Sequence, residues 1–143
     1  MKVVLDTNVL ISGLLWRGGP WEILKLAEAG QVTLCITPPL LEELEEVLKH
    51  EKLRPRLQEL GVEREEVITY VLSLVSLYEE TCSVEAVSSD PSDNIVINCA
   101  LSAGASLIIS GDRHLLTLAR YQDIQIISPH DFITGKLWEG SSA

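Results

Sequence analysis

Short apolar runs alternate along the chain with longer segments in which apolar residues recur at helical spacing. The apolar runs predict buried strands at residues 2–5, 32–36, 106–110 and 124–128, with an irregular strand within residues 76–88. The periodic segments predict helices at residues 9–15, 20–30, 38–49, 63–77, 90–103 and 112–121. Strands with almost no polar residues that alternate with helices are typical of a parallel sheet covered on both faces. The pattern therefore predicts an α/β fold.

Proline, glycine and threonine mark several ends of the expected elements. Pro20 suits the first turn of its helix, and Thr37 is expected to cap the helix that starts at Pro38 or Pro39. Residues 51–62 are polar and interrupted by a proline and a glycine, so we expect a solvated connector there.

The composition is that of one globular domain. The chain has 143 residues, of which 46% are apolar, and a mean hydropathy of +0.20. We expect a single domain over residues 1–135 and a C-terminal tail at 136–143, frayed at its end. The apolar runs are far shorter than the roughly 20 residues of a membrane helix, and the N-terminus shows no secretory signal, so we expect a soluble, cytoplasmic protein without membrane association.

Cysteine and histidine are too sparse and too scattered to build a typical metal or disulfide framework. The three cysteines, Cys35, Cys82 and Cys99, lack C-x-x-C spacing and are expected to be reduced core residues. The three histidines lack H-x-x-x-H spacing, which argues against a histidine-based zinc site.

The chain is strongly acidic, with 11 basic and 21 acidic residues and a formal net charge of −10. This balance argues against a protein that coats nucleic acid through a broad positive field. It leaves open a protein that cuts nucleic acid through a bound divalent cation, because such an ion requires clustered carboxylates.

Two aspartates follow expected strands of the sheet. Asp6 ends the first apolar run, and Asp112 follows Ser110-Gly111 at the end of another. Ligands bind to open parallel sheets at the carboxyl ends of the strands, and two such carboxylates would repel each other unless a cation lay between them. Each aspartate alone is equally well explained as a helix cap, but the pair favours a metal site.

Three further acids have two interpretations each. Asp90 and Asp93 lie in Asp90-Pro91-Ser92-Asp93, a strong helix start, so Asp90 is expected to be a cap and Asp93 stays ambiguous. In the helix from residue 38 to 49, Glu43 and Glu45 border the apolar face on opposite sides, and spacing alone does not choose between them.

These motifs resemble a known family. LDTNVLIS at the start, LLEEL in the third expected helix, DPSDN and IISGDRHLL resemble the PIN domain, and most closely the small VapC-like toxin components of toxin–antitoxin modules. The resemblance implies a three-layer α/β/α sandwich with a parallel sheet in the order 3-2-1-4-5. It also implies an acidic pocket that holds Mg²⁺ or Mn²⁺. The catalytic and metal-binding acids it implies are Asp6, Glu43, Asp93 and Asp112, supported by Thr7, Asn8, Ser110 and Asp90.

One position departs from the family pattern. PIN proteins commonly carry a second acid two residues after the fourth one, as in GDxDLL, but here that residue is His114. A second metal ion would be held less firmly by a neutral imidazole, and activity would be slow or would favour Mn²⁺. The alternative is a histidine on the helix surface.

The resemblance implies a metal-dependent endoribonuclease, the toxin of a toxin–antitoxin pair, with an antitoxin protein as partner and a homodimer or higher homo-oligomer as its assembly. One alternative is a non-catalytic PIN-like scaffold that binds RNA or protein. Another is a receiver-like signalling domain, but that would require an adjacent acid pair on the first strand and a lysine after the last, which VVLDTN and IISPHD lack.

Basic residues offer candidate contacts to RNA. Four of them occur within eight positions and form a possible phosphate clamp next to the pocket, and one more follows Asp112; they are Lys49, Lys52, Arg54, Arg56 and Arg113. A solvated connector explains the first four equally well. Trp16 and Trp21 flank the Gly-Gly-Pro turn with Arg17; core packing is expected for them, with base stacking or partner binding as the alternative.

Overall fold

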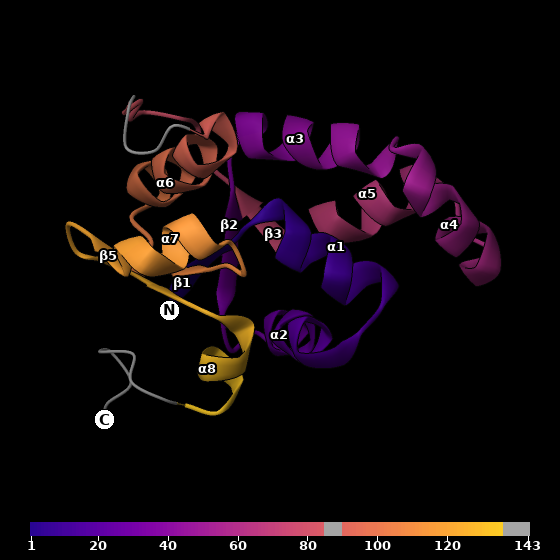
Figure 1. The fold of residues 1–143 in the computed structure, drawn as a ribbon, viewed down its shortest axis with the longest axis horizontal. Helices are drawn as coiled ribbons and strands as arrows, with labels where there is room; N and C mark the ends of the chain where they lie inside the picture. Colours follow the sequence, from indigo (N-terminus) through magenta and orange to yellow (C-terminus); the bar gives the residue numbers. More distant parts are fainter. Residues whose placement is uncertain (85–89, 136–143) are drawn as a thin grey trace.

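A six-stranded sheet forms the centre of the protein (Figure 1). The structure is a computed structural model, and it describes residues 1–84 and 90–135. The strands are β1 (Lys2–Leu5), β2 (Thr33–Ile36), β3 (Val75–Leu77), β4 (Leu107–Ile109), β5 (Arg120–Tyr121) and β6 (Ile124–Ile127). Their order is β3-β2-β1-β4-β6-β5, and all neighbours are parallel except β5 and β6. The five parallel strands thus confirm the expected order 3-2-1-4-5.

Helices cover both faces of this sheet (Figure 1). They are α1 (Thr7–Leu15), α2 (Gly18–Glu28), α3 (Pro38–Leu48), α4 (Arg54–Leu60), α5 (Arg64–Leu74), α6 (Pro91–Ala103), α7 (Arg113–Leu118) and α8 (Pro129–Ile133), with a 3₁₀ turn, η1, at Glu51–Leu53. The structure is therefore the α/β/α sandwich that the sequence predicts.

The core has two halves because side chains of a strand alternate between faces. Val3 and Leu5 of β1 pack in one cluster with residues of α1, α2 and α5. Val4 packs in the other cluster with residues of α6 and α7. Helix α3 supplies Leu40 to the second cluster and Leu44 to the first, so it lies across the carboxyl edge of the sheet. This placement decides where the glutamates of α3 lie.

Residues 51–62 correct one prediction. We expected a connector, but the segment contains η1 and α4. Pro55 lies in the first turn of α4, where its missing N–H costs nothing, and Gly61 ends the helix in the left-handed conformation with φ of 69°. Pro55 and Gly61, which we interpreted as breaks, are thus the start and stop signals of a helix. The segment packs against the core through the buried side chains of Leu53 and Leu57.

The expected element ends also differ at three places. The helix expected at residues 63–77 is α5, and it stops at Leu74 because Val75 pairs with Leu34 and begins β3. The expected helix 112–121 stops at Leu118, since Ala119 takes φ of 63° and Tyr121 pairs with Ile124. Helix α8 is absent from the predictions, although its Ser128 cap, which accepts from the Asp131 N–H, is visible in the sequence.

The remaining predictions concern the C-terminal tail, the irregular strand, membrane helices and the cysteines. The predicted tail at 136–143 and part of the irregular strand, 85–89, lie outside the described residues. No described helix has the length and apolar character needed to cross a bilayer. All three cysteines are free; Cys35 and Cys99 are buried as expected, whereas Cys82 is only half-buried. Burial raises the pKa of the Cys99 thiol to about 11.

Candidate functional site

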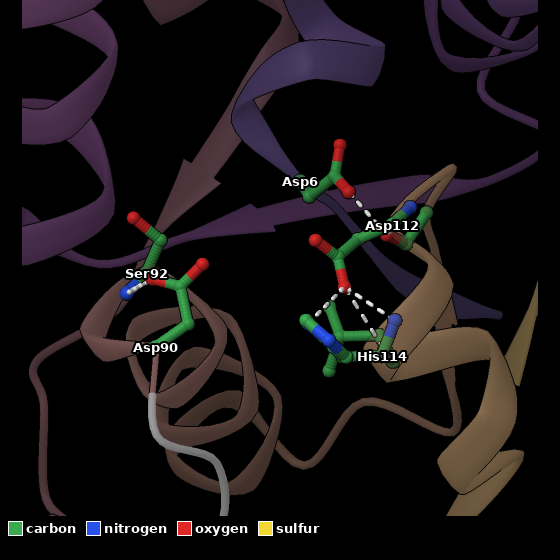
Figure 2. A network of polar contacts seen from close by, with 7 residues as sticks. Asp6, Asp90, Ser92, Asp112 and His114 are labelled. Carbon is green, nitrogen blue, oxygen red and sulfur yellow. Dashed lines mark hydrogen bonds and ion pairs between the residues drawn. The ribbon is translucent and has the colours of Figure 1, made fainter.

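A cavity of about 220 Å³ opens at the carboxyl edge of the sheet, and it collects acids from four parts of the chain. It is lined by Asp6, Thr7, Asn8, Glu43, Val47, Asp90, Ser92, Asp93, Val96, Asp112 and Leu115. The convergence follows from topology, because β1 and β4 are parallel neighbours and the residues after them meet at one edge. Figure 2 shows Asp6, Asp90 and Asp112 around one space, with His114 beside Asp112.

Asp6 is held by hydrogen bonds to both carboxylate oxygens, and the residue is only 7% exposed. Its Oδ1 accepts the N–H of Val9 at 2.8 Å and so caps α1. Its Oδ2 accepts the hydroxyl of Ser110, which is fully buried. Burial raises the pKa of Asp6, and the negative charge of Asp112 adds to this rise, while the two hydrogen bonds oppose it. The site therefore carries negative charge that its own hydrogen bonds do not fully compensate.

Asp112 is linked to Asp6 through Ser110. The N–H of Asp112 donates to Ser110 Oγ at 2.9 Å, so one buried hydroxyl ties together the ends of β1 and β4. The Oδ1 of Asp112 accepts the N–H groups of His114 at 2.8 Å and Leu115 at 3.1 Å, which caps α7. Oδ2 takes no part in that cap.

Glu43 and Glu45 are separated by the structure. Glu43 lines the acidic cavity, and its Oε1 accepts the hydroxyl of the buried Thr7 at 2.5 Å. Glu45 is exposed and borders a different hollow, beside Lys49 and Arg64. Sequence spacing left the two residues equivalent, and the way α3 lies across the sheet distinguishes them.

Asp90 and Asp93 both line the cavity from the first turn of α6. Asp90 is the N-cap, since its Oδ1 accepts the N–H of Ser92 at 2.9 Å. Asp93 is only 3% exposed. For Asp90 the two interpretations, cap and site residue, are thus compatible, because the same residue caps α6 and lines the cavity.

The donor set fits a hard divalent cation. The cavity presents carboxylate oxygens, the ligands that Mg²⁺ and Mn²⁺ prefer. Among the described residues, no lysine or arginine forms an ion pair with Asp6, Glu43 or Asp112. A bound cation would compensate the negative charge of these three acids. One oxygen each of Asp93 and Asp112 and a ring nitrogen of His114 lie within 4.8 Å of one another.

The basic residues that were expected to contact phosphates next to the pocket are not among the residues that line it. None of Lys49, Lys52, Arg54 and Arg56 lines it. Arg56 has a structural role, because its Nε donates to the carbonyl oxygen of Leu15 at 2.7 Å.

Two of the other basic residues line hollows of their own. Lys49 and Arg54 border a separate hollow of about 510 Å³ that Arg64 also lines. Arg113 borders a hollow next to the acids, together with Asn8 and Asp112. Of the candidates for RNA contact, Arg113 is therefore the one placed beside the acids.

Neither Trp16 nor Trp21 is buried in the core. Trp16 is 50% exposed, with the guanidinium of Arg56 5.7 Å from its ring centre. The ring of half-buried Trp21 lies between Arg17 and Lys25, at 5.2 and 5.1 Å. Core packing was the wrong expectation for Trp16.

Comparisons with known proteins agree with this architecture. The model of the family described as PIN domain matches residues 2–114. Uncharacterized protein MJ1680 from Methanocaldococcus jannaschii is 35% identical over 121 residues, which are 82% of this chain and 75% of that protein.

Two solved structures have a similar fold. VapBC2 from Rickettsia felis, bound to a DNA fragment from its promoter, matches with a TM-score of 0.62 and 14% identity, over 88% of this chain and 97% of that one. DNA-bound VapBC from Salmonella typhimurium matches with a TM-score of 0.60 and 18% identity, over 90% and 98% of the two chains.

Proposed function

The chain belongs to the PIN-domain family, and on that premise we propose that it is a divalent-metal-dependent endoribonuclease and the toxin of a toxin–antitoxin pair. PIN domains are generally nucleases that use divalent metal ions. The observation that carries the proposal is the convergence of four acids on one cavity, where the described lining residues include no lysine or arginine; the acids are Asp6, Glu43, Asp93 and Asp112.

Asp6, Asp93 and Asp112 would hold Mg²⁺ or Mn²⁺ at this cavity. When bound, the ion would acidify a water molecule and stabilise negative charge on the attacked phosphoryl oxygen. The hydrogen bonds of the two carboxylates support this role: Asp6 accepts from Ser110 and from the Val9 N–H, and Asp112 accepts from the His114 N–H. Little reorganisation would then be needed at the moment of reaction.

Glu43 would orient the attacking water and accept its proton. Thr7 occupies Oε1 of Glu43, so Oε2 is the oxygen left for the water. The hydroxyl also fixes the carboxylate against the start of α1, within the same cavity as Asp6. Hydrolysis by this route needs no covalent intermediate.

The partner is proposed from the same similarity. The two solved structures compared above are both VapBC complexes. We propose that this chain likewise binds an antitoxin protein, which would cover the acidic cavity, and that it forms a homodimer. A non-catalytic scaffold is the outcome to be excluded by experiment.

Cleavage of a labelled single-stranded RNA tests the proposal. With Mg²⁺ or Mn²⁺ present, Asp6→Asn and Asp93→Asn should abolish cleavage, and Glu43→Gln should lower its rate by about 100-fold or more, the scale of a lost general base. Glu45→Gln is the matched control on the same helix and should cleave like the wild type. Cleavage that persists in EDTA, or that survives both aspartate changes, would refute the proposal.

Calorimetric titration with Mn²⁺ separates an enzyme from a scaffold. Binding that is lost in Asp6→Asn supports the metal-dependent enzyme. A wild-type protein that binds no Mn²⁺ supports the non-catalytic scaffold.

A further inference from the structure

His114 lies beside Asp112, one of the acids that line the cavity, but is not itself a lining residue. Its side chain is 76% exposed, whereas Asp112 next to it is 31% exposed and Asp93 is buried. Figure 2 shows the imidazole beside the Asp112 carboxylate, and its Nδ1 lies 3.9 Å from Asp112 Oδ1. The ring thus borders the acids on their solvent side.

The positions of these three groups suit one shared ion. One possible ligand atom from each of Asp93, Asp112 and His114 lies within 4.8 Å of the other two. Two ligands at about 2.1 Å from a common ion are at most about 4.2 Å apart. The set is thus within less than an ångström of that spacing, and the exposed His114 side chain has room to move while Asp112 stays in place as the cap of α7.

Asp112 and His114 lie close together because both belong to the start of α7. Asp112 is the N-cap of α7 and His114 is the second residue of the same helix, so their relative position depends on a single hydrogen-bonded turn. Asp93 comes from the first turn of α6, a different element, and also lines the cavity.

We infer that His114 donates an imidazole nitrogen to the divalent ion held by Asp93 and Asp112, and that this ligand makes the site select Mn²⁺ over Mg²⁺. The inference rests on the proposed function for the presence of the ion. Imidazole suits first-row transition metals, whereas Mg²⁺ strongly prefers oxygen ligands. The nitrogen therefore adds affinity for Mn²⁺ and little for Mg²⁺.

A surface histidine that only pairs with Asp112 would behave differently. Such a contact is worth little at this exposure, and its loss would leave the preference between the two metals unchanged. Metal selectivity, rather than stability or cleavage, is therefore the property that distinguishes a ligand from a surface contact.

Pulsed electron paramagnetic resonance of the full-length protein loaded with Mn²⁺ tests the inference directly, together with calorimetric affinities for Mn²⁺ and Mg²⁺. The wild type should show coupling of Mn²⁺ to an imidazole nitrogen, and His114→Ala should lose it. Its Mn²⁺ affinity should fall by at least about tenfold, since even indirect metal partners cost 10–100-fold, while its Mg²⁺ affinity stays nearly the same.

Two variants complete the experiment. His50→Ala, at an exposed histidine outside the cavity, should keep both the nitrogen coupling and the metal affinities. His114→Asp restores an oxygen ligand and should bring the two affinities closer together. Nitrogen coupling that survives in His114→Ala, or Mn²⁺ bound by the wild type without such coupling, overturns the inference but leaves the proposed function standing. A wild type that binds no Mn²⁺ overturns both.

Discussion

Replacing Ser110 by alanine tests whether one hydroxyl holds the acidic site together. Ser110 Oγ is fully buried, donates to Asp6 Oδ2 and accepts the N–H of Asp112 at 2.9 Å. Alanine fits the same space, because it differs only by the missing oxygen. The variant Ser110→Ala therefore removes two hydrogen bonds with almost no change in packing.

The cost follows from the two bonds. A hydrogen bond to a charged group contributes about 1.5–3 kcal/mol, and a neutral one about 0.5–1.5 kcal/mol. In the variant, Oδ2 of the buried Asp6 loses its hydrogen-bond donor, so we expect the free-energy cost of this charged bond to lie in the upper part of its range. Together the loss is about 3 kcal/mol, which for a chain of 143 residues corresponds to a fall in Tm of ~10 °C.

Equilibrium urea unfolding in EDTA at neutral pH measures this loss without metal. Ser106→Ala is the matched control, since Ser106 is exposed just before the same strand and should change the free energy of unfolding by less than about 0.5 kcal/mol. Added Mn²⁺ should raise the Tm of the wild type more than that of Ser110→Ala, because the ion binds the folded site and that site is less well ordered in the variant.

A Ser110→Ala protein as stable as Ser106→Ala would contradict this reasoning. It would mean that Asp6 and Asp112 keep their positions without the shared hydroxyl. An unchanged response to Mn²⁺ would show in addition that the hydroxyl does not prepare the site for a cation.

Two further predictions concern the scaffold. Gly13→Ala should destabilise the fold by about 1–3 kcal/mol, because a Cβ there would lie 3.0 Å from the backbone of Pro20. In the control Gly19→Ala the added Cβ meets no atom within 4 Å, so this variant should have nearly wild-type stability. Thermal unfolding compares the two variants, and equal losses of stability would count against the close packing of α1 on α2. Tyr70 donates to Glu28 at 2.5 Å, and this bond lowers the pKa of Glu28 from 4.5. The stability that Tyr70→Phe removes should therefore be present above pH 4.5 and vanish as pH falls through the lowered pKa. Burial and Glu28 raise the pKa of Tyr70 to about 12, so the same stability should persist below pH 10 and be lost as pH rises through about 12. Urea unfolding of both proteins across pH checks this, and a difference independent of pH would exclude the Tyr70–Glu28 bond as its source.

The sequence by itself determined the elements whose signals are local. Apolar runs predict the parallel strands, and the alternation with helices predicts their order once the family resemblance is added. Asp90 as the cap of α6 and Gly104 as its left-handed end are visible in the sequence because both depend only on neighbouring backbone groups. The same local logic, applied to Pro55 and Gly61 as start and stop rather than as breaks, would have found α4.

Tertiary structure alone decided which side chains share the cavity. Neighbouring helix positions differ by about 100° in direction, so Glu43 and Glu45 could be told apart only after α3 was packed across the sheet. Arg56 belongs to a basic run in the sequence, but a carbonyl 41 residues away in the chain binds its guanidinium. The placement of His114 against Asp93 likewise depends on how α6 and α7 meet at the sheet edge. Spacing describes one helix at a time, whereas a site requires the relative position of several.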